Sequence, residues 1–162
     1  SLKSISKHMT FVISVVRGDL VATKSFNHKD FLNFDQQARE KATRYLANAG
    51  YLVKDNPDQY GIDLLCECKK SNKPFGVEVE IKKGWRGEFD FETLHIPYRK
   101  KKFVDQNALF FVFSSHLFSV AIVSSTVIRN CNVIEKENYK VEGREKFFDI
   151  PVNLIKLAKL DF

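Results

Sequence analysis

Residues 75–82 read Phe-Gly-Val-Glu-Val-Glu-Ile-Lys, and this segment carries the charged groups best suited to chemistry. A β-strand alternates its side chains between two faces, with about 7 Å between neighbours on one face. Alternation therefore predicts that Glu78, Glu80 and Lys82 share one face, with apolar side chains on the other. Two carboxylates beside an ammonium suit a cation site or proton transfer, although the same pattern also fits the solvated face of a sheet.

A second acid, Asp63, lies in the mainly apolar stretch at residues 62–65. An unpaired carboxylate is costly among apolar side chains, so Asp63 should face a partner, a metal or a cleft. A turn at residues 69–74 places the segments 61–68 and 75–82 on two neighbouring strands. Asp63 and Glu80 could then converge on one Mg²⁺ or Mn²⁺, because these ions prefer oxygen ligands. A structural salt bridge is the alternative.

The elements that must position these groups can be predicted from periodicity. Apolar residues between positions 34 and 49 form one helical stripe and Gly50 follows, which predicts a helix over 33–49. A short strand at 51–54 comes next, and a β-hairpin is expected at residues 10–26 around Gly18. Connected by turns, these segments and the two strands with the acids predict an α/β fold.

The second half of the chain predicts further strands and two helices. Residues 84–93 resemble an irregular connection, and Pro97 suits the start of a helix over 98–104. Strands are expected at 108–114, 118–124 and 147–150, while 125–146 stays ambiguous. Pro151 and the apolar residues after it predict a C-terminal helix.

Bulk properties narrow the class of protein. The 162 residues are 44% apolar or aromatic, enough for one domain with a core, so residues 1–162 are expected to form a single domain. The net charge of +6 is compatible with a polyanionic partner. No apolar run approaches the roughly 20 residues of a membrane span, and the three cysteines are typical of core positions, so a cytoplasmic protein without membrane contact is expected.

These motifs, taken in order, resemble the PD-(D/E)xK superfamily of restriction-endonuclease-like nucleases and Holliday-junction resolvases. The signature of that family is an acid on one strand followed by (D/E)xK on the next, which Gly61-Ile62-Asp63 and Glu80-Ile81-Lys82 match. Tyr45-Leu46, Gly50-Tyr51 and Val53 are similar to the helix and first strand of the family. The resemblance covers residues 34–82, with the core expected over about 34–124.

The resemblance implies a fold, an activity and roles for residues. It implies a central mixed sheet flanked by helices, to which the N-terminal hairpin would be an addition, and Mg²⁺- or Mn²⁺-dependent hydrolysis of phosphodiester bonds, as an endonuclease. Asp63, Glu80 and the Ile81 carbonyl would hold the metal, and Lys82 would position or help to deprotonate the attacking water. The resemblance also favours DNA over RNA as the substrate.

Several acids near the motif have alternative interpretations. Pro57-Asp58 spells the literal dipeptide of the signature but lies in a turn, so Asp63 is the better ligand. Glu78 could assist the metal or form a salt bridge with a lysine. Related nucleases often carry an acid on the first helix. Its distance from Gly50 favours Glu40, whereas the helical wheel places Asp35 closer to the apolar stripe.

A basic segment follows the motif. Residues 82–102 hold seven basic against three acidic residues. Such a run is often only a solvated face, but beside a metal motif it predicts contacts with phosphates. Trp85 and Tyr98 could stack on a base or pack in the core. The expected nucleic-acid contacts are Lys83, Trp85, Arg86, Arg99, Lys100, Lys101 and Lys102.

Two other classes of function stay open at this point. The chain could use a nuclease-like fold only to bind nucleic acid or protein, but a binder has no need of the complete set of two acids and a lysine. It could also be an assembly protein with a salt-bridged strand. Pairing with a second copy of the chain, as a homodimer, is a further expectation that the sequence does not decide.

Overall fold

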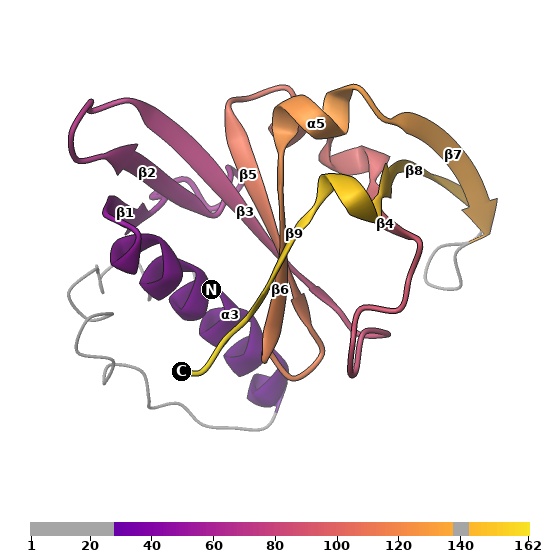
Figure 1. Cartoon of the computed structure of the whole chain (residues 1–162), viewed down its shortest axis with the longest axis horizontal. Helices are drawn as coiled ribbons and strands as arrows, with labels where there is room; N and C mark the ends of the chain where they lie inside the picture. The colour runs from indigo at the N-terminus through magenta and orange to yellow at the C-terminus, as the bar shows by residue number, and fades with distance from the viewer. Residues whose placement is uncertain (1–27, 138–142) are drawn as a thin grey trace.

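The strands of the protein form two sheets in the computed structural model, which describes residues 28–137 and 143–162 (Figure 1). The larger sheet has six strands in the order β1-β2-β3-β5-β6-β9, and the smaller has three in the order β4-β8-β7. β3 and β5 pair in parallel, whereas the other paired strands are antiparallel. A mixed central sheet with few helices confirms the predicted α/β class.

The helices and strands follow in chain order. They are α3 (His28–Asn48), β1 (Tyr51–Asp55), β2 (Leu64–Cys68), β3 (Pro74–Lys82), β4 (Thr93–Pro97), the 3₁₀ helix η1 (Tyr98–Lys100), α4 (Lys101–Val104), β5 (Ala108–Ser114), β6 (Ser119–Ser124), α5 (Ser125–Arg129), β7 (Asn132–Glu137), β8 (Arg144–Pro151), the 3₁₀ helix η2 (Val152–Leu154) and β9 (Lys156–Lys159).

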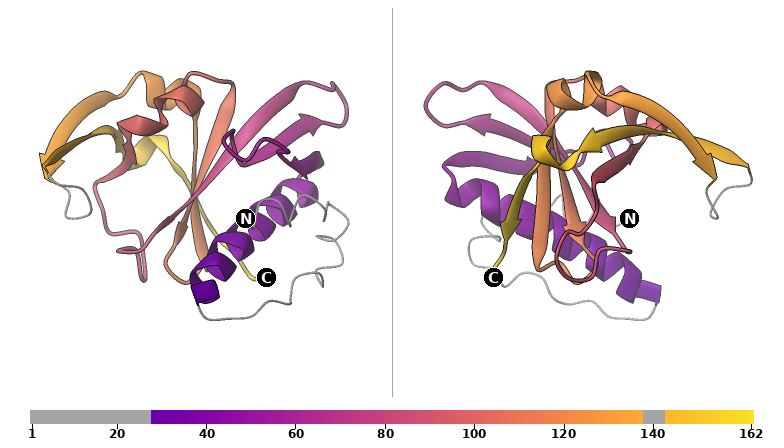
Figure 2. Two further views of the ribbon diagram at one scale, coloured as in Figure 1. Left: turned by 180° about the vertical axis from the view of Figure 1, so that it is seen from behind. Right: turned by 45° about the vertical axis from the view of Figure 1, so that its right-hand side comes forward.

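Helix α3 covers one face of the larger sheet (Figures 1 and 2). Its predicted apolar stripe is buried at Ala38, Ala42 and Leu46 and packs with strand residues such as Val77. The helix begins at His28, earlier than the sequence predicted. It ends at Asn48, and Gly50 follows with a φ of +97°, a conformation that glycine adopts at little cost.

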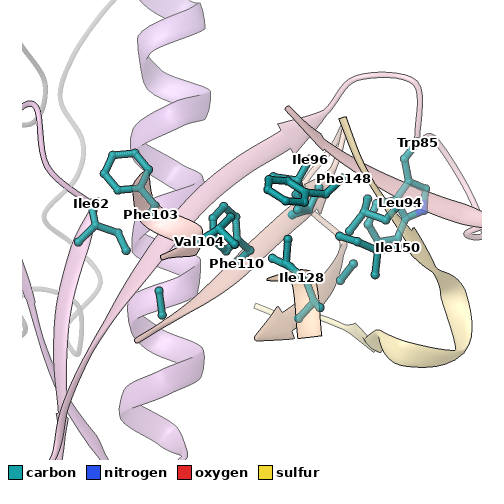
Figure 3. Close-up of a cluster of buried hydrophobic side chains, with 14 residues drawn as sticks. Ile62, Trp85, Leu94, Ile96, Phe103, Val104, Phe110, Ile128, Phe148 and Ile150 are labelled. Carbon is teal, nitrogen blue, oxygen red and sulfur yellow. The ribbon is translucent and has the colours of Figure 1, made fainter. Parts of the chain in front are cut away.

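The opposite face of the larger sheet packs against the smaller sheet, α4 and α5. The alternation of β5 divides its side chains between the two faces, so that Phe110 and Val112 join this second core. Figure 3 shows the cluster, with Trp85 and Leu94 at one end and Phe103 at the other. Trp85 is only 2% exposed, and its Nε1 donates to the Gly87 carbonyl. The prediction that Trp85 contacts nucleic acid is therefore wrong.

Several predicted elements are confirmed. β1, β3 and β5 have the expected positions, and the helical segment over 98–104 forms as η1 followed by α4. The strand predicted at 147–150 is longer and spans Arg144–Pro151. The ambiguous residues after 124 contain α5 and β7, and β4 begins where the sequence predicted only an irregular connection.

The predicted C-terminal helix is wrong. Pro151 is followed by a single 3₁₀ turn and then by β9, which pairs with β6 from Ser119↔Lys159 to Ile122↔Lys156. The backbone of β6 would otherwise lack a partner on that side, and pairing satisfies those polar groups. A helix of this length is marginal on its own, so the sheet edge determines the conformation.

Two further predictions concern the ends of the chain and the membrane. The hairpin expected at residues 10–26 lies outside the described residues. Among the helices that the structure describes, none is long and apolar enough to cross a membrane. Cys66 is buried in the core beneath α3, as predicted, and Cys68 is half-buried.

Candidate active site

The site is built where the ladder between β2 and β3 ends. The two strands pair from Glu67↔Pro74 to Leu64↔Val77, and β3 then continues with β5 on one side. On the other side no strand within residues 28–137 and 143–162 pairs with this part of β3, and this side is its open edge. Asp63 lies at this point and is 9% exposed. Its Oδ2 accepts a hydrogen bond from the Val79 N–H at 2.9 Å. The carboxylate thus accepts the hydrogen bond that a backbone carbonyl of β2 would accept if the ladder continued, and this contact fixes the position of Asp63.

Glu78 lies opposite Asp63 across the end of the ladder. The Asp63 N–H donates to Glu78 Oε1 at 3.3 Å. Burial raises the pKa of Glu78 to about 8, and the nearby charges of Asp63 and Glu80 act in the same direction, although Lys100 opposes them. A buried acid with this pKa keeps a proton near neutrality even with that ammonium beside it.

Lys100 is the ammonium that opposes the rise in the pKa of Glu78. Its Nζ lies 2.6 Å from Glu78 Oε2 and 3.2 Å from Glu80 Oε2. Burial alone would lower the pKa of Lys100, but the two carboxylates raise it above its ordinary value. Pro97 ends β4 and precedes η1, which carries Lys100 toward β3. The sequence predicted Lys100 only as a phosphate contact, and its place between the two acids was missed.

These groups share a polar cavity of about 380 Å³. Asp63, Glu78, Glu80 and Lys100 line it, as the face assignment of β3 predicted for the two glutamates. The other lining residues are Asp35, Gln59, Tyr60, Gly61, Val79, Arg99, Lys102 and Phe103. The cavity therefore brings four carboxylates and three basic side chains to the open edge of β3.

Lys82 lies elsewhere. Strand alternation places it on the face of Glu80, but its Nζ is 4.6 Å from the centroid of the Phe91 ring. Burial and the charge of Lys136, on β7, lower its pKa. Among the described residues, the cavity lining includes Lys100 and not Lys82. The structure thus gathers Asp63 and Glu80 with a lysine that is distant in sequence.

The acid from the first helix is better placed at Asp35 than at Glu40. Asp35 lines the cavity, and its Oδ2 accepts from Arg39 Nη1 at 2.5 Å. Glu40 accepts from Gln36 Nε2 at 3.5 Å and is not among the described residues that line the site. The helical wheel, rather than the distance to Gly50, indicated the acid that lies at the site.

A second cavity, of about 540 Å³, adjoins the first. Asp35, Val79 and Glu80 line both cavities. The second one is further lined by Phe34, Ile81, Lys83, Arg86, Ser115 and His116. Backbone groups two residues apart in a strand point to the same edge, so the Ile81 carbonyl faces the same open edge as the Val79 amide.

The remaining basic residues separate into two groups. Arg99 lines the first cavity and pairs with Glu145, and Lys102 lines it and donates to the Tyr60 carbonyl at 3.3 Å. Lys101, in contrast, forms an exposed pair with Asp105 at 2.7 Å. The Pro57-Asp58 dipeptide lies in a turn, where Asp58 Oδ1 accepts from the Tyr60 N–H at 3.0 Å.

The oxygen donors at the open edge suit a hard divalent cation in their chemistry. Asp63 and Glu80 offer carboxylates and Ile81 offers a carbonyl, and Mg²⁺ and Mn²⁺ prefer such ligands. Within the described part of the chain, however, no three His, Cys, Asp or Glu side chains are gathered as a metal-binding group. Lys100 provides the positive charge between Glu78 and Glu80.

A third cavity is not the site. It measures about 570 Å³ and lies against β1 and β2, where its lining joins apolar side chains with one carboxylate, Glu67, and one ammonium, Lys54. The acids and bases that can act together lie in the smaller cavity at the open edge of β3.

The sequence matches no protein-family model and no curated protein. The geometry of the site and the sequence motif are therefore the basis for assigning a function.

Proposed function

We propose that the chain is a divalent-metal-dependent nuclease with a restriction-endonuclease-like core, and that it hydrolyses phosphodiester bonds in DNA. One observation carries the proposal: Asp63, Glu78 and Glu80 meet Lys100 in an open cavity that Arg99 and Lys102 also line. A structural ion pair needs neither a third carboxylate nor access from solvent. Acids and basic groups that line one cavity suit a metal-bound phosphate.

The order of elements supports the same proposal. In the sequence the motif resembles PD-(D/E)xK nucleases, and α3, β1, β2 and β3 follow one another as that resemblance implies. Asp63 precedes β2 and Glu80 lies in β3, so the two acids come from neighbouring strands of a mixed sheet. This arrangement is compatible with the family core.

In the proposed reaction, Asp63, Glu80 and the Ile81 carbonyl would hold Mg²⁺ or Mn²⁺, which would supply positive charge to the phosphate and lower the pKa of a water molecule. Lys100 contributes a positive charge beside Glu80, where charge develops as the phosphodiester bond breaks. Buried Glu78 positions that ammonium through their contact at 2.6 Å.

The geometry favours Lys100 over Lys82 for the role of the site lysine. A group stabilises a transition state only from hydrogen-bonding or close electrostatic range. Lys100 is in contact with Glu80 at 3.2 Å, whereas the ammonium of Lys82 stacks on Phe91. The lysine that the sequence motif names would then serve the fold or the binding of substrate.

Cleavage assays test the proposed function. Supercoiled, linear and branched DNA are incubated with the protein in Mg²⁺, Mn²⁺ or EDTA, with RNA as a further substrate. We expect metal-dependent cleavage that Asp63→Asn reduces at least 10²-fold, on the scale of removing one electrostatic group. Glu67→Gln, a change of a β2 acid outside the cavity, should cut like wild type. The proposal fails if no nucleic acid is cut in any metal, or if both variants remain fully active.

A binding or assembly protein is the second candidate, and one observation favours it. The ammonium of Lys100 already lies on both Glu78 and Glu80, so the cluster is compensated without a metal. A protein of this kind would bind DNA without turnover. Its affinity for nucleic acid would not change when Mg²⁺ or Mn²⁺ is added, which distinguishes it from the nuclease in the same assay.

A further inference from the structure

The two cavities beside β3 form one path across its open edge. They have volumes of about 380 and 540 Å³ and share the lining residues Asp35, Val79 and Glu80. β2 does not pair with β3 beyond Val77, so no strand in the described part of the chain separates the two cavities on this side. A chain-like ligand that lies across Glu80 would enter one cavity and leave through the other.

The two outer ends of this path have the same composition. Arg99, Lys102 and Tyr60 line only the first cavity, and Lys83, Arg86 and Phe34 line only the second. Asp35 and Glu80 line both and lie at the shared middle, whereas Asp63 and Glu78 line only the first. Basic groups at both ends of an acidic centre fit a polyanion that crosses the centre, because its phosphates can pair with cations on each side.

The aromatic residues at the two ends are unusually accessible. Tyr60 is 76% exposed and Phe34 is 42% exposed. Among the described residues, the exposed large hydrophobic side chains include only one other aromatic, Phe118, which lies outside both cavities and has the Lys41 ammonium 5.5 Å from its ring centroid. Burial of a ring lowers the free energy, so two exposed rings that line these cavities beside basic groups indicate surfaces for planar partners.

We propose that this path, the groove from Tyr60 to Phe34 through Glu80, binds a single strand of nucleic acid. The inference rests on the proposed function and deepens it, since it names the form of the substrate. Bases stack on Tyr60 and on Phe34, while the phosphates between them contact the basic side chains. Bases within a duplex are already stacked on their neighbours, so they cannot use these rings.

The stacking contacts also determine where the strand is held. A base on Tyr60 and a base on Phe34 anchor the strand on both sides of Glu80, so that a phosphate between them lies at the acids. When the strand is held on both sides of the reacting phosphate, the binding energy also orients that phosphate toward the acids. A duplex would reach the acids only where it is frayed or branched.

Fluorescence anisotropy in EDTA tests the inference without cleavage. Labelled oligonucleotides of one sequence are offered as single-stranded DNA, single-stranded RNA and duplex DNA. We expect both single strands, or one of them, to bind at least tenfold more tightly than the duplex. Tyr60→Ala and Phe34→Ala should each weaken single-strand binding about tenfold, and Tyr60→Phe, which keeps the ring, should bind like wild type.

Leu154→Ala is the matched control, because Leu154 is 47% exposed and lies in η2, outside both cavities. All three side chains are exposed, so these changes leave the core intact. The inference would be overturned if the duplex bound as tightly as the single strands or more tightly, or if no oligonucleotide bound. It would also be overturned if Tyr60→Ala and Phe34→Ala bound single strands like wild type. If single strands bind as expected but are never cut in Mg²⁺ or Mn²⁺, the nuclease proposal fails and this one stands.

Discussion

Replacing each of the two lysines near Glu80 separates the geometry from the sequence motif. Lys100→Met removes an ammonium that is 22% exposed and leaves Glu78, 4% exposed, without that contact. Breaking a buried ion pair by removing one partner costs about 3–5 kcal/mol. Glu78 already keeps a proton for most of the time at pH 7, since its pKa is raised to about 8 beside Lys100, which limits the loss. We therefore expect the free energy of unfolding to fall by roughly 2–3 kcal/mol at pH 7.

Lys82→Met is the matched change, in which the ring of Phe91 loses its cation 4.6 Å away. A partly exposed cation–π contact contributes about 0.5–1 kcal/mol. Urea unfolding at pH 7 measures both losses. In single-turnover cleavage with Mg²⁺, Lys100→Met should lose about 10² in rate, and Lys82→Met less than tenfold. DNA affinity should change by only a few fold in both variants, because a transition-state contact contributes little to ground-state binding.

The comparison is decided by which lysine carries the larger effect. If Lys82→Met loses 10² in cleavage rate while Lys100→Met retains activity, the role returns to the lysine of the motif and the contact of Lys100 with Glu80 is structural. If Lys100→Met unfolds no more easily than Lys82→Met, the buried pair with Glu78 is not formed in solution.

Three further outcomes are expected. Calorimetric titration with Mn²⁺ should show a site that Asp63→Asn or Glu80→Gln weakens at least tenfold, and unchanged binding in both variants would remove the metal site. Folding raises the pKa of Glu78 from 4.5 to about 8, so between these values the folded state keeps a proton that the unfolded state releases. The free energy of unfolding of wild type should therefore fall as pH rises from 5 to 8, by up to about 1.4 kcal/mol per pH unit more than that of Glu78→Gln. Urea unfolding at each pH measures this difference, and equal pH dependence in the two proteins would contradict it. Replacing Arg99 and Lys102 together by Ala should reduce the slope of log K against log salt concentration by about 2 in DNA binding, whereas an unaltered slope would make both residues part of a solvated face.

The strand that carries the acids could be predicted because its pattern is local. Residues 75–82 alternate over the whole strand, and burial of Val77 and Val79 under α3 then requires Glu78 and Glu80 to face the other way. The same holds for the stripe of α3, where the side chains that pack are three or four residues apart. Register and face follow from such patterns without knowledge of the rest of the chain.

The elements that depend on distant partners were not predictable in this way. β9 is a strand because β6 offers an edge, and β4 is one because Leu94 and Ile96 pack in the second core while the backbone pairs with β8. Neither segment has a local pattern long enough to exclude a helix or a loop. Their conformation is determined by tertiary contacts, which override a weak intrinsic preference.

The site lysine shows the same limit at the level of chemistry. Alternation correctly places Lys82 on the strand face of Glu80, but a flexible side chain of this length can lie along several directions, and here it lies on Phe91. Glu78, in contrast, is buried to 4% exposure beside Asp63, so an ionised Glu78 requires a nearby cation. Lys100 lies in η1, directly after β4, and its ammonium contacts Glu78 although the two residues are 22 positions apart in the sequence. The motif therefore indicates where the acids are, and the burial of Glu78 determines which lysine joins them.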